Sequence, residues 1–259
     1  MLVFTMAGCA ARQPSPPTRV SLPDQEASAL AERDRLLTSL QTPVIMDYLG
    51  PSGNLKAREQ LTARRPASLR VEVMSPLGVA LIVTADDSEI AVFDPSHNTL
   101  MRGEANAVTL EHFTRIPMAP AQAVQLLLSL VPDRSVLTSA PSSDRTEGEM
   151  KVLSYAGAGA ASYELGFSGG QLAMVRASDA ARAIYEVAYS DYRDIGAISF
   201  PFAIEARFFA SATTVKFHYL NPLIDRQIAD SAFVLAPGPG TKLIELRFGP
   251  PSTLKPAPG

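Results

Sequence analysis

The side chains that most often carry catalytic or metal chemistry are few and scattered in this sequence. The 259 residues include three histidines, at positions 97, 112 and 218, and one cysteine, Cys9. No cluster of cysteines or carboxylates accompanies these histidines at ligand spacing, so we predict no metal site. His97 fits a turn, His112 the surface of a helix, and His218 the solvent side of a strand.

Motifs of nucleophilic and phosphate chemistry do not stand out either. The sequence has no G-x-S-x-G elbow and no evident Ser/His/Asp set. The segment GAGAAS, residues 157–162, formally resembles a glycine-rich loop, but no apolar parallel strand and following helix surround it. A flexible hairpin connection explains it better. We therefore expect no enzymatic activity and no cofactor.

The composition is that of a globular protein. It is 46% hydrophobic, with a net charge of −3 and charges of both signs interspersed, and the length fits one large β domain or two smaller ones. No run of five basic residues occurs, which argues against nucleic acid as a partner. No uninterrupted apolar run of 18 residues occurs, so we predict no transmembrane helix.

The lone cysteine follows an apolar stretch. Residues 1–9 read MLVFTMAGC, with Ala7 and Gly8 directly before Cys9. Small residues in these positions resemble the lipobox of bacterial lipoprotein signal peptides, which implies that residues 1–9 are part of a signal peptide and that Cys9 is acylated. Ala10, rather than an acidic residue, then favours sorting to the outer membrane. The alternative is an ordinary frayed N-terminus with a chance cysteine.

Proline-rich segments flank the predicted folded region. Residues 10–23 contain four prolines, and such a stretch stays extended at about 3.1 Å per residue, as a tether does. Residues 249–259 form a second proline-rich segment, which we expect to be a disordered tail. A tether behind a lipid anchor would hold a folded domain clear of a membrane surface.

A leucine stands where a tight turn between strands is predicted. The segment VEVMSPLGVALIV, residues 71–83, has two strand-like runs around Ser75, Pro76, Leu77 and Gly78. Turn tips normally carry small or polar residues. Transfer of a leucine from water into lipid is favourable by roughly 1.5–3 kcal/mol. Leu77 is therefore a candidate membrane probe, unless it folds back onto a neighbouring strand or helix.

Hydrophobic periodicity predicts one domain, residues 24–248, that is mainly β. An amphipathic helix is expected over 24–40, and two further helices over 109–116 and 120–131, the first capped by Thr109 and the second stopped by Pro132. About ten to twelve short antiparallel strands are expected, and 134–148 is expected to be a loop. The segments with strand-like alternation, from which these strands would come, span 55–62, 69–73, 79–84, 89–93, 99–102, 151–155, 162–167, 172–176, 184–189, 200–209, 213–219, 232–235 and 242–248.

The turn SPLG and the segment IPMAPAQAVQLLLSLVPD, residues 116–133, carry a family resemblance. Together with the lipobox and the strand order, they resemble LolB, the outer-membrane lipoprotein receptor of Gram-negative bacteria, and the wider LolA/LolB-like group. The resemblance implies an incomplete antiparallel β-barrel whose helices close an apolar cavity for acyl chains. It also implies that Leu77, flanked by Pro76 and Gly78, enters the membrane during delivery of lipoproteins.

Apolar positions on the predicted strands, and two on the second middle helix, are candidates for the lining of this cavity. A fully packed core would show the same alternation, so the cavity assignment depends on the resemblance. The candidate lining residues are Val71, Val73, Leu81, Val83, Leu127, Leu130, Phe202, Ile204, Phe208, Val215 and Phe217.

Three functions agree with these patterns. The first is a lipid-anchored protein at the periplasmic face of the outer membrane, which accepts acylated proteins from a periplasmic LolA-like carrier and helps to insert them into that membrane. The second is a carrier of another amphiphile. The third is a structural or assembly lipoprotein whose barrel is filled by its own side chains.

Overall fold

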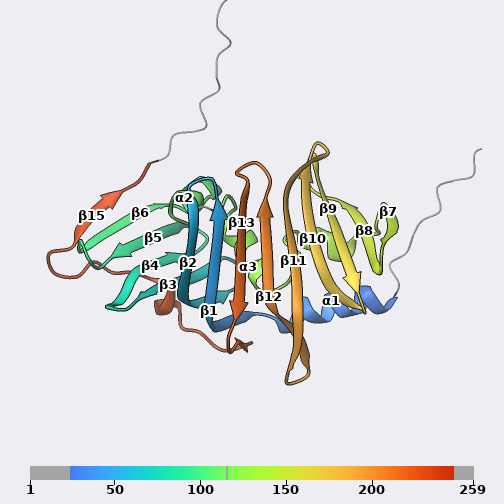
Figure 1. The fold of residues 1–259 in the computed structure, drawn as a ribbon, viewed down its shortest axis with the longest axis horizontal. Coiled ribbons are helices and arrows are strands. Elements are labelled where there is room, and N and C mark those ends of the chain that lie inside the picture. The colour runs from blue at the N-terminus through green and yellow to red at the C-terminus, as the bar shows by residue number, and fades with distance from the viewer. Residues whose placement is uncertain (1–23, 115, 248–259) are drawn as a thin grey trace, which may run out of the picture.

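The computed structural model describes residues 24–114 and 116–247. The predicted signal peptide with Cys9, the tether over 10–23 and the tail over 249–259 lie outside the described residues. One curved sheet of fifteen strands dominates the described part, and three α-helices lie against it (Figure 1). No helix of the described part is both long and apolar enough to cross a membrane.

The first helix is shorter than predicted, and a strand follows it. α1 spans Asp24–Leu36 and β1 spans Ser39–Gly50, so the predicted helix over 24–40 ends too late. Pro43 made this strand hard to recognise, because proline lacks the amide that a central strand needs. The carbonyl of Pro43 accepts a hydrogen bond from the Leu220 amide, which places the Pro43 nitrogen on the same side. On that side β1 pairs with β14 through Leu40 and Gln41 and with β13 from Val44 onward, so Pro43 lies in the gap between the two partners.

Two meanders of antiparallel strands make up the sheet. The first runs through β2 (Gly53–Arg64), β3 (Ser68–Ser75), β4 (Gly78–Ala85), β5 (Glu89–Asp94) and β6 (Thr99–Glu104). The second runs through β7 (Ser143–Glu147), β8 (Met150–Ala156), β9 (Ala161–Ser168), β10 (Gln171–Asp179), β11 (Arg182–Ile195), β12 (Ile198–Phe208) and β13 (Thr213–Tyr219). The chain ends with β14 (Leu223–Ile224), a 3₁₀ turn (Asp230–Phe233) and β15 (Lys242–Glu245).

The meanders join where β1 pairs antiparallel with β13. The strand order is β15-β6-β5-β4-β3-β2-β1-β13-β12-β11-β10-β9-β8-β7, and β15 pairs parallel with β6. Because β7 and β15 lie at opposite ends of this order, the sheet remains open.

The predicted incomplete antiparallel barrel is confirmed. The number of strands was underestimated because β1 carries a proline, β14 is short, and β7, within the predicted loop over 134–148, is polar on both faces. The predicted strand over 232–235 is largely replaced by the 3₁₀ turn, and GAGAAS connects β8 to β9 as a hairpin.

The middle helices begin and end at signals that differ from those predicted. α2 spans Ala107–Thr114, and its first turn is capped by Asn106 rather than Thr109, because the Asn106 side chain accepts a hydrogen bond of 2.9 Å from the Thr109 amide. α3 spans Pro120–Leu127 and ends before Pro132. Ser129 has φ 51°, and the amides of Ser129 and Leu130 bond back to the carbonyls of Leu126 and Gln125. This is a Schellman motif, with serine in the place that glycine usually takes.

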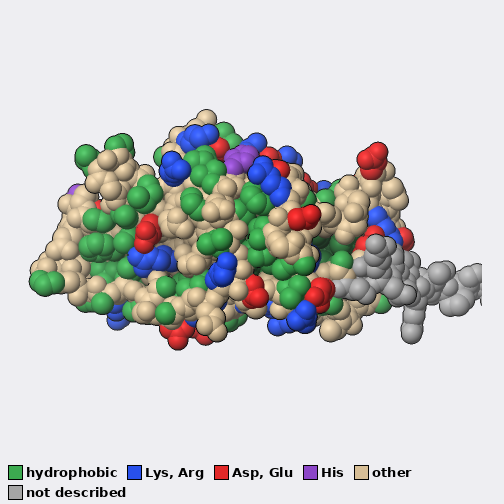
Figure 2. Space-filling model, turned by 90° about the horizontal axis from the view of Figure 1, so that it is seen from below, with side chains coloured by type: hydrophobic (Ala, Val, Ile, Leu, Met, Phe, Trp, Pro, Cys, Tyr) green, Lys and Arg blue, Asp and Glu red, His purple; other side chains and the backbone are tan. Residues whose placement is uncertain are grey.

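The convex face of the sheet carries alternating charges. Salt bridges run between strands from β7 to β13. They link Arg145 of β7 to Glu164 of β9 across β8, and, on adjacent strands, Glu164 to Arg176, Arg176 to Glu186, and Lys216 to Glu205, at 2.6–3.0 Å. Such cross-strand pairs favour one register and keep this face wet. Charges of both signs are interspersed with apolar side chains on the face seen from below (Figure 2).

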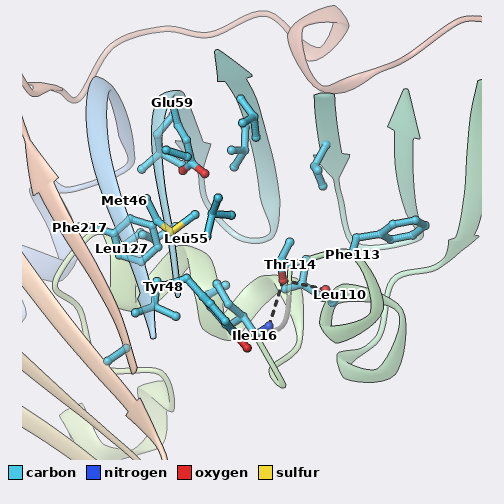
Figure 3. A pocket seen from close by; sticks show the side chains of 18 of the residues that line it. Met46, Tyr48, Leu55, Glu59, Leu110, Phe113, Thr114, Ile116, Leu127 and Phe217 are labelled. Atoms are coloured by element: carbon cyan, nitrogen blue, oxygen red, sulfur yellow. Dashed lines mark hydrogen bonds between the residues drawn. The ribbon is translucent and has the colours of Figure 1, made fainter. Parts of the chain in front are cut away.

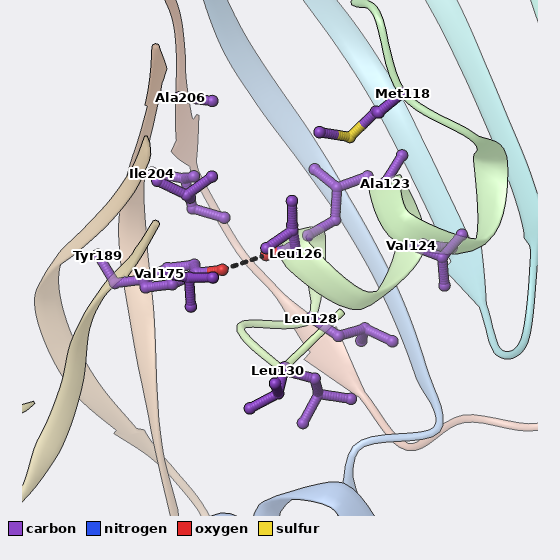
Figure 4. Packing of buried hydrophobic residues seen from close by; sticks show 14 of the residues in the cluster. Met118, Ala123, Val124, Leu126, Leu128, Leu130, Val175, Tyr189, Ile204 and Ala206 are labelled. Atoms are coloured by element: carbon purple, nitrogen blue, oxygen red, sulfur yellow. Dashed lines mark hydrogen bonds between the residues drawn. The ribbon is translucent and has the colours of Figure 1, made fainter. Parts of the chain in front are cut away.

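The concave face is apolar and divided into two parts. Under β8–β11, residues such as Leu153, Leu165 and Val175 are fully buried in a filled core. The C-terminal end of α3 packs beside this part, and its Leu126 belongs to the same buried cluster as Val175 of β10 and Ile204 of β12 (Figure 4). The part under β1–β4 also contains buried residues, but it leaves a pocket.

Candidate functional site

A pocket of about 530 Å³ lies between the concave face of the sheet and the two middle helices. Its walls come from β1–β4 and β11–β13, and its floor and lid from α2, α3 and the segment that joins them. The volume lies within the range of about 300–1,000 Å³ typical of ligand sites. The rim is formed by the turn between β1 and β2, where Ser52, Gly53 and Asn54 are exposed.

Most of the candidate lining residues surround this pocket. Val71, Val73, Leu81, Val83, Leu127, Ile204, Phe208, Val215 and Phe217 all contribute to its wall. Two others lie elsewhere. Leu130 follows the end of α3 and is buried below it in the filled core (Figure 4). Phe202 is half-buried under the guanidinium group of Arg193, 4.5 Å from the ring centre.

Several wall residues are only half-buried although they lie on the concave face. Val71, Val73, Leu81 and Phe217 keep accessible surface there, unlike the fully buried side chains under β8–β11. Side chains of a filled core would close over such positions. The interior at this end of the sheet is therefore hollow.

Pocket residues from several elements were missed from the sequence. Among them, Met46 and Tyr48 belong to β1, the strand that Pro43 concealed, and Leu110 and Phe113 belong to α2, which was predicted without a role in the cavity. Another is Glu59 on β2. The sequence does indicate that Glu59 faces the interior, because Glu59 stands between Ala57 and Leu61 in the alternation that marks the dry face.

Glu59 is the single residue with a charged side chain among those that line the pocket. It is 6% exposed and lies opposite Val44 of β1 and Val73 of β3. In the close view Glu59 lies at the opposite end of the pocket from Tyr48 and Ile116 (Figure 3). Burial raises the pKa of the Glu59 carboxyl to about 7, and within the described chain no hydrogen bond or counter-charge offsets this rise.

Polar contacts hold the C-terminal end of α3 against the sheet. The hydroxyl of Tyr189 donates to the Leu126 carbonyl at 3.1 Å, and that of Tyr219 donates to the Leu127 carbonyl at 2.9 Å (Figure 4 shows the former). The Arg33 guanidinium of α1 donates to the Ser129 hydroxyl. Burial raises the pKa of both tyrosines well above the usual value, so both hydroxyls remain donors. The end of α3 that carries Pro120 lacks a side-chain cap.

The turn between β3 and β4 presents Leu77 to solvent. Leu77 is 99% exposed, which excludes the alternative in which its side chain folds back onto a neighbouring strand or helix. The Ser75 hydroxyl accepts from the Leu77 amide at 3.3 Å and donates to the Gly78 carbonyl at 2.9 Å. Gly78 has φ 118°, which favours glycine. The turn itself therefore keeps Leu77 pointing outward.

The apolar side chains that line the pocket suit contact with an apolar chain. Within residues 24–114 and 116–247, no three histidine, cysteine, aspartate or glutamate side chains gather as metal ligands would. His97 contacts Asp94 in a turn, and His218 is exposed on β13, at the kinds of position predicted for them.

No protein-family model matches the sequence, and no curated protein matches it either. Solved structures do match in fold. A LolA superfamily protein from Nitrosomonas europaea has a TM-score of 0.55 at 13% identity, over 80% of this chain and 96% of its own. A DUF1329 family protein from Desulfovibrio piger has a TM-score of 0.56 at 9% identity, over 83% of this chain and 98% of its own. A domain named for outer-membrane lipoprotein sorting, from Vibrio parahaemolyticus, has a TM-score of 0.55 at 6% identity, over 80% of this chain and 95% of its own.

These matches cover nearly the whole of each solved chain and most of this one. At such low identities they concern the arrangement of the elements. The predicted resemblance to the LolA/LolB-like group is confirmed at that level: the chain has the LolA-like fold, an open curved sheet with helices on its concave face.

Proposed function

We propose that the protein binds the acyl chains of lipoproteins in the pocket under β1–β4. The observation that carries this proposal is the hollow itself: an apolar pocket of about 530 Å³ in a protein whose other half has a filled core. Empty apolar volume is destabilising by itself, so a pocket of this size is best explained by a ligand that fills it.

The finer role we propose is that of an acceptor at the outer membrane. Cys9 would carry the lipid anchor, residues 10–23 would be the tether, and a periplasmic LolA-like carrier would deliver the lipoprotein. The exposed Leu77 supports a further step, in which the turn of Pro76, Leu77 and Gly78 enters the bilayer while the acyl chains leave the pocket. The solved lipoprotein-sorting domain of the same fold makes this class of ligand the first to test.

Native mass spectrometry tests the binding. The full chain with Cys9→Ala, which prevents acylation of the protein itself, is mixed with a synthetic lipopeptide. We expect a one-to-one complex that an unacylated peptide of the same sequence does not form. Ala57→Phe, which places a ring at a half-buried position of the pocket wall, should weaken this complex, whereas Arg58→Phe on the opposite face should not. A protein that stays bare with the lipopeptide would contradict lipoprotein binding and, because the pocket is hollow, leave a carrier of another amphiphile as the better explanation.

A further inference from the structure

The position of Glu59 along the pocket suggests which ligands the pocket prefers. Leu55 lies at the rim and is 57% exposed, whereas Leu61, six residues further along the same strand, is fully buried. Both line the pocket on the same face of β2 as Glu59. At about 3.3 Å per residue, Glu59 lies roughly 13 Å inward from Leu55. The carboxyl is therefore beside the interior of a bound chain, well away from a head group at the rim.

An apolar chain beside this carboxyl would leave it without a partner. The same-face neighbours Ala57 and Leu61 and the cross-strand neighbours Val44 and Val73 are all apolar. A buried polar group without a hydrogen bond is costly, and a buried unpaired charge more so. The wall of the pocket therefore holds a carboxyl group at a defined depth among apolar side chains, and a ligand with a hydrogen-bond donor at the same depth would satisfy it.

We propose that Glu59 accepts a hydrogen bond from a hydroxyl group on the acyl chain itself, so that the pocket selects hydroxylated chains over plain ones. This proposal depends on the proposed function, because it assumes that a chain enters with its head group at the rim. Polar side chains at the rim, those of Ser52 and Asn54, suit such a head group. A chain with its hydroxyl next to the head group would not reach Glu59, whereas one with a mid-chain hydroxyl would.

Matched octadecanoates test this selection. Isothermal titration calorimetry on the full Cys9→Ala chain would compare the plain acid with acids hydroxylated next to the carboxylate, at mid-chain and at the chain end. We expect the mid-chain hydroxy acid to bind roughly tenfold more tightly than the plain acid, as one added hydrogen bond of about 1.4 kcal/mol would give. Glu59→Leu should abolish this difference and improve binding of the plain acid.

Two controls separate the possible failures. Glu59→Gln keeps an acceptor and should retain part of the preference, and Glu72→Gln, which changes a glutamate paired with Arg70, should leave it unchanged. Thermal denaturation would check that each variant is folded. Equal affinities for all four acids, with or without Glu59, would overturn the selection and leave chain binding intact. If none of the acids binds and the lipopeptide does not bind either, both this proposal and the proposed function are wrong.

Discussion

Glu59 makes the stability of the protein depend on pH in an unusual direction. Its pKa is about 7 in the folded chain, against an ordinary value of 4.5. Between these two pH values the folded state holds a proton that the unfolded state has lost. The contribution of Glu59 to stability is therefore highest below pH 4.5, falls as the pH rises to about 7, and stays low above it.

Urea denaturation of the wild type and Glu59→Gln, from about pH 4 to about pH 8, measures this contribution. As the pH rises across that range, we expect the free energy of unfolding of Glu59→Gln to increase relative to that of the wild type, by at most about 3 kcal/mol. Glu72→Gln serves as the control, since Glu72 is half-buried beside Arg70. Parallel curves for Glu59→Gln and the wild type would mean that the carboxyl is solvated in solution.

The hydroxyl of Tyr219 should stabilise the fold through its hydrogen bond to the lid helix α3, whereas the unpaired hydroxyl of Tyr155 should not. Tyr219→Phe removes the donor to the Leu127 carbonyl inside the protein, which should lower the free energy of unfolding by about 1–2 kcal/mol. It should also speed hydrogen exchange in α3. Tyr155 is equally buried, but its hydroxyl has no hydrogen-bond partner, so Tyr155→Phe should be neutral or stabilising. Equal losses in the two variants would show that the hydroxyl bond to the lid carries no stability.

The β3–β4 hairpin should separate ligand binding from delivery to a membrane. Leu77→Glu places a charge at the exposed tip, where it costs the fold little but opposes entry into lipid. We expect lipopeptide binding to be unchanged and transfer of the bound lipopeptide to liposomes to be blocked. Leu243→Glu, at another exposed leucine on β15, is the matched control. Normal transfer by Leu77→Glu would remove the hairpin from the mechanism.

At the scale of the whole molecule, the pairing of β1 with β13 makes two meanders into one sheet. Strands at the centre of a cooperative unit open only when the unit unfolds, whereas edge strands open locally. Hydrogen exchange should therefore be slowest in β1, β12 and β13 and fastest in β7 and β15. Exchange of one whole meander well before the other would indicate that the two halves unfold separately.

The sequence predicted the parts of this fold that follow simple periodicity. Strands with one wet and one dry face were recognised, and with them several residues of the pocket wall, such as Val71 and Phe217. Features that depend on tertiary partners were not recognised. Pro43 is compatible with a central strand because of a gap between β13 and β14, and α3 ends early through backbone bonds at Ser129. Alternation could not distinguish a hollow from a filled core, so the hollow and the burial of Glu59 required the structure.

The terminal strand β7 has a consequence for how this protein behaves at high concentration. A sheet that does not close leaves backbone amides and carbonyls at its margin, where another molecule could add a strand and start polymerisation. β7 is short and polar, and Arg145 forms salt bridges with Glu147 and Glu164. Approach of a second copy would strip water from these charges. The same five residues that made β7 hard to recognise in the sequence thus disfavour the addition of a second copy at this edge of the open sheet.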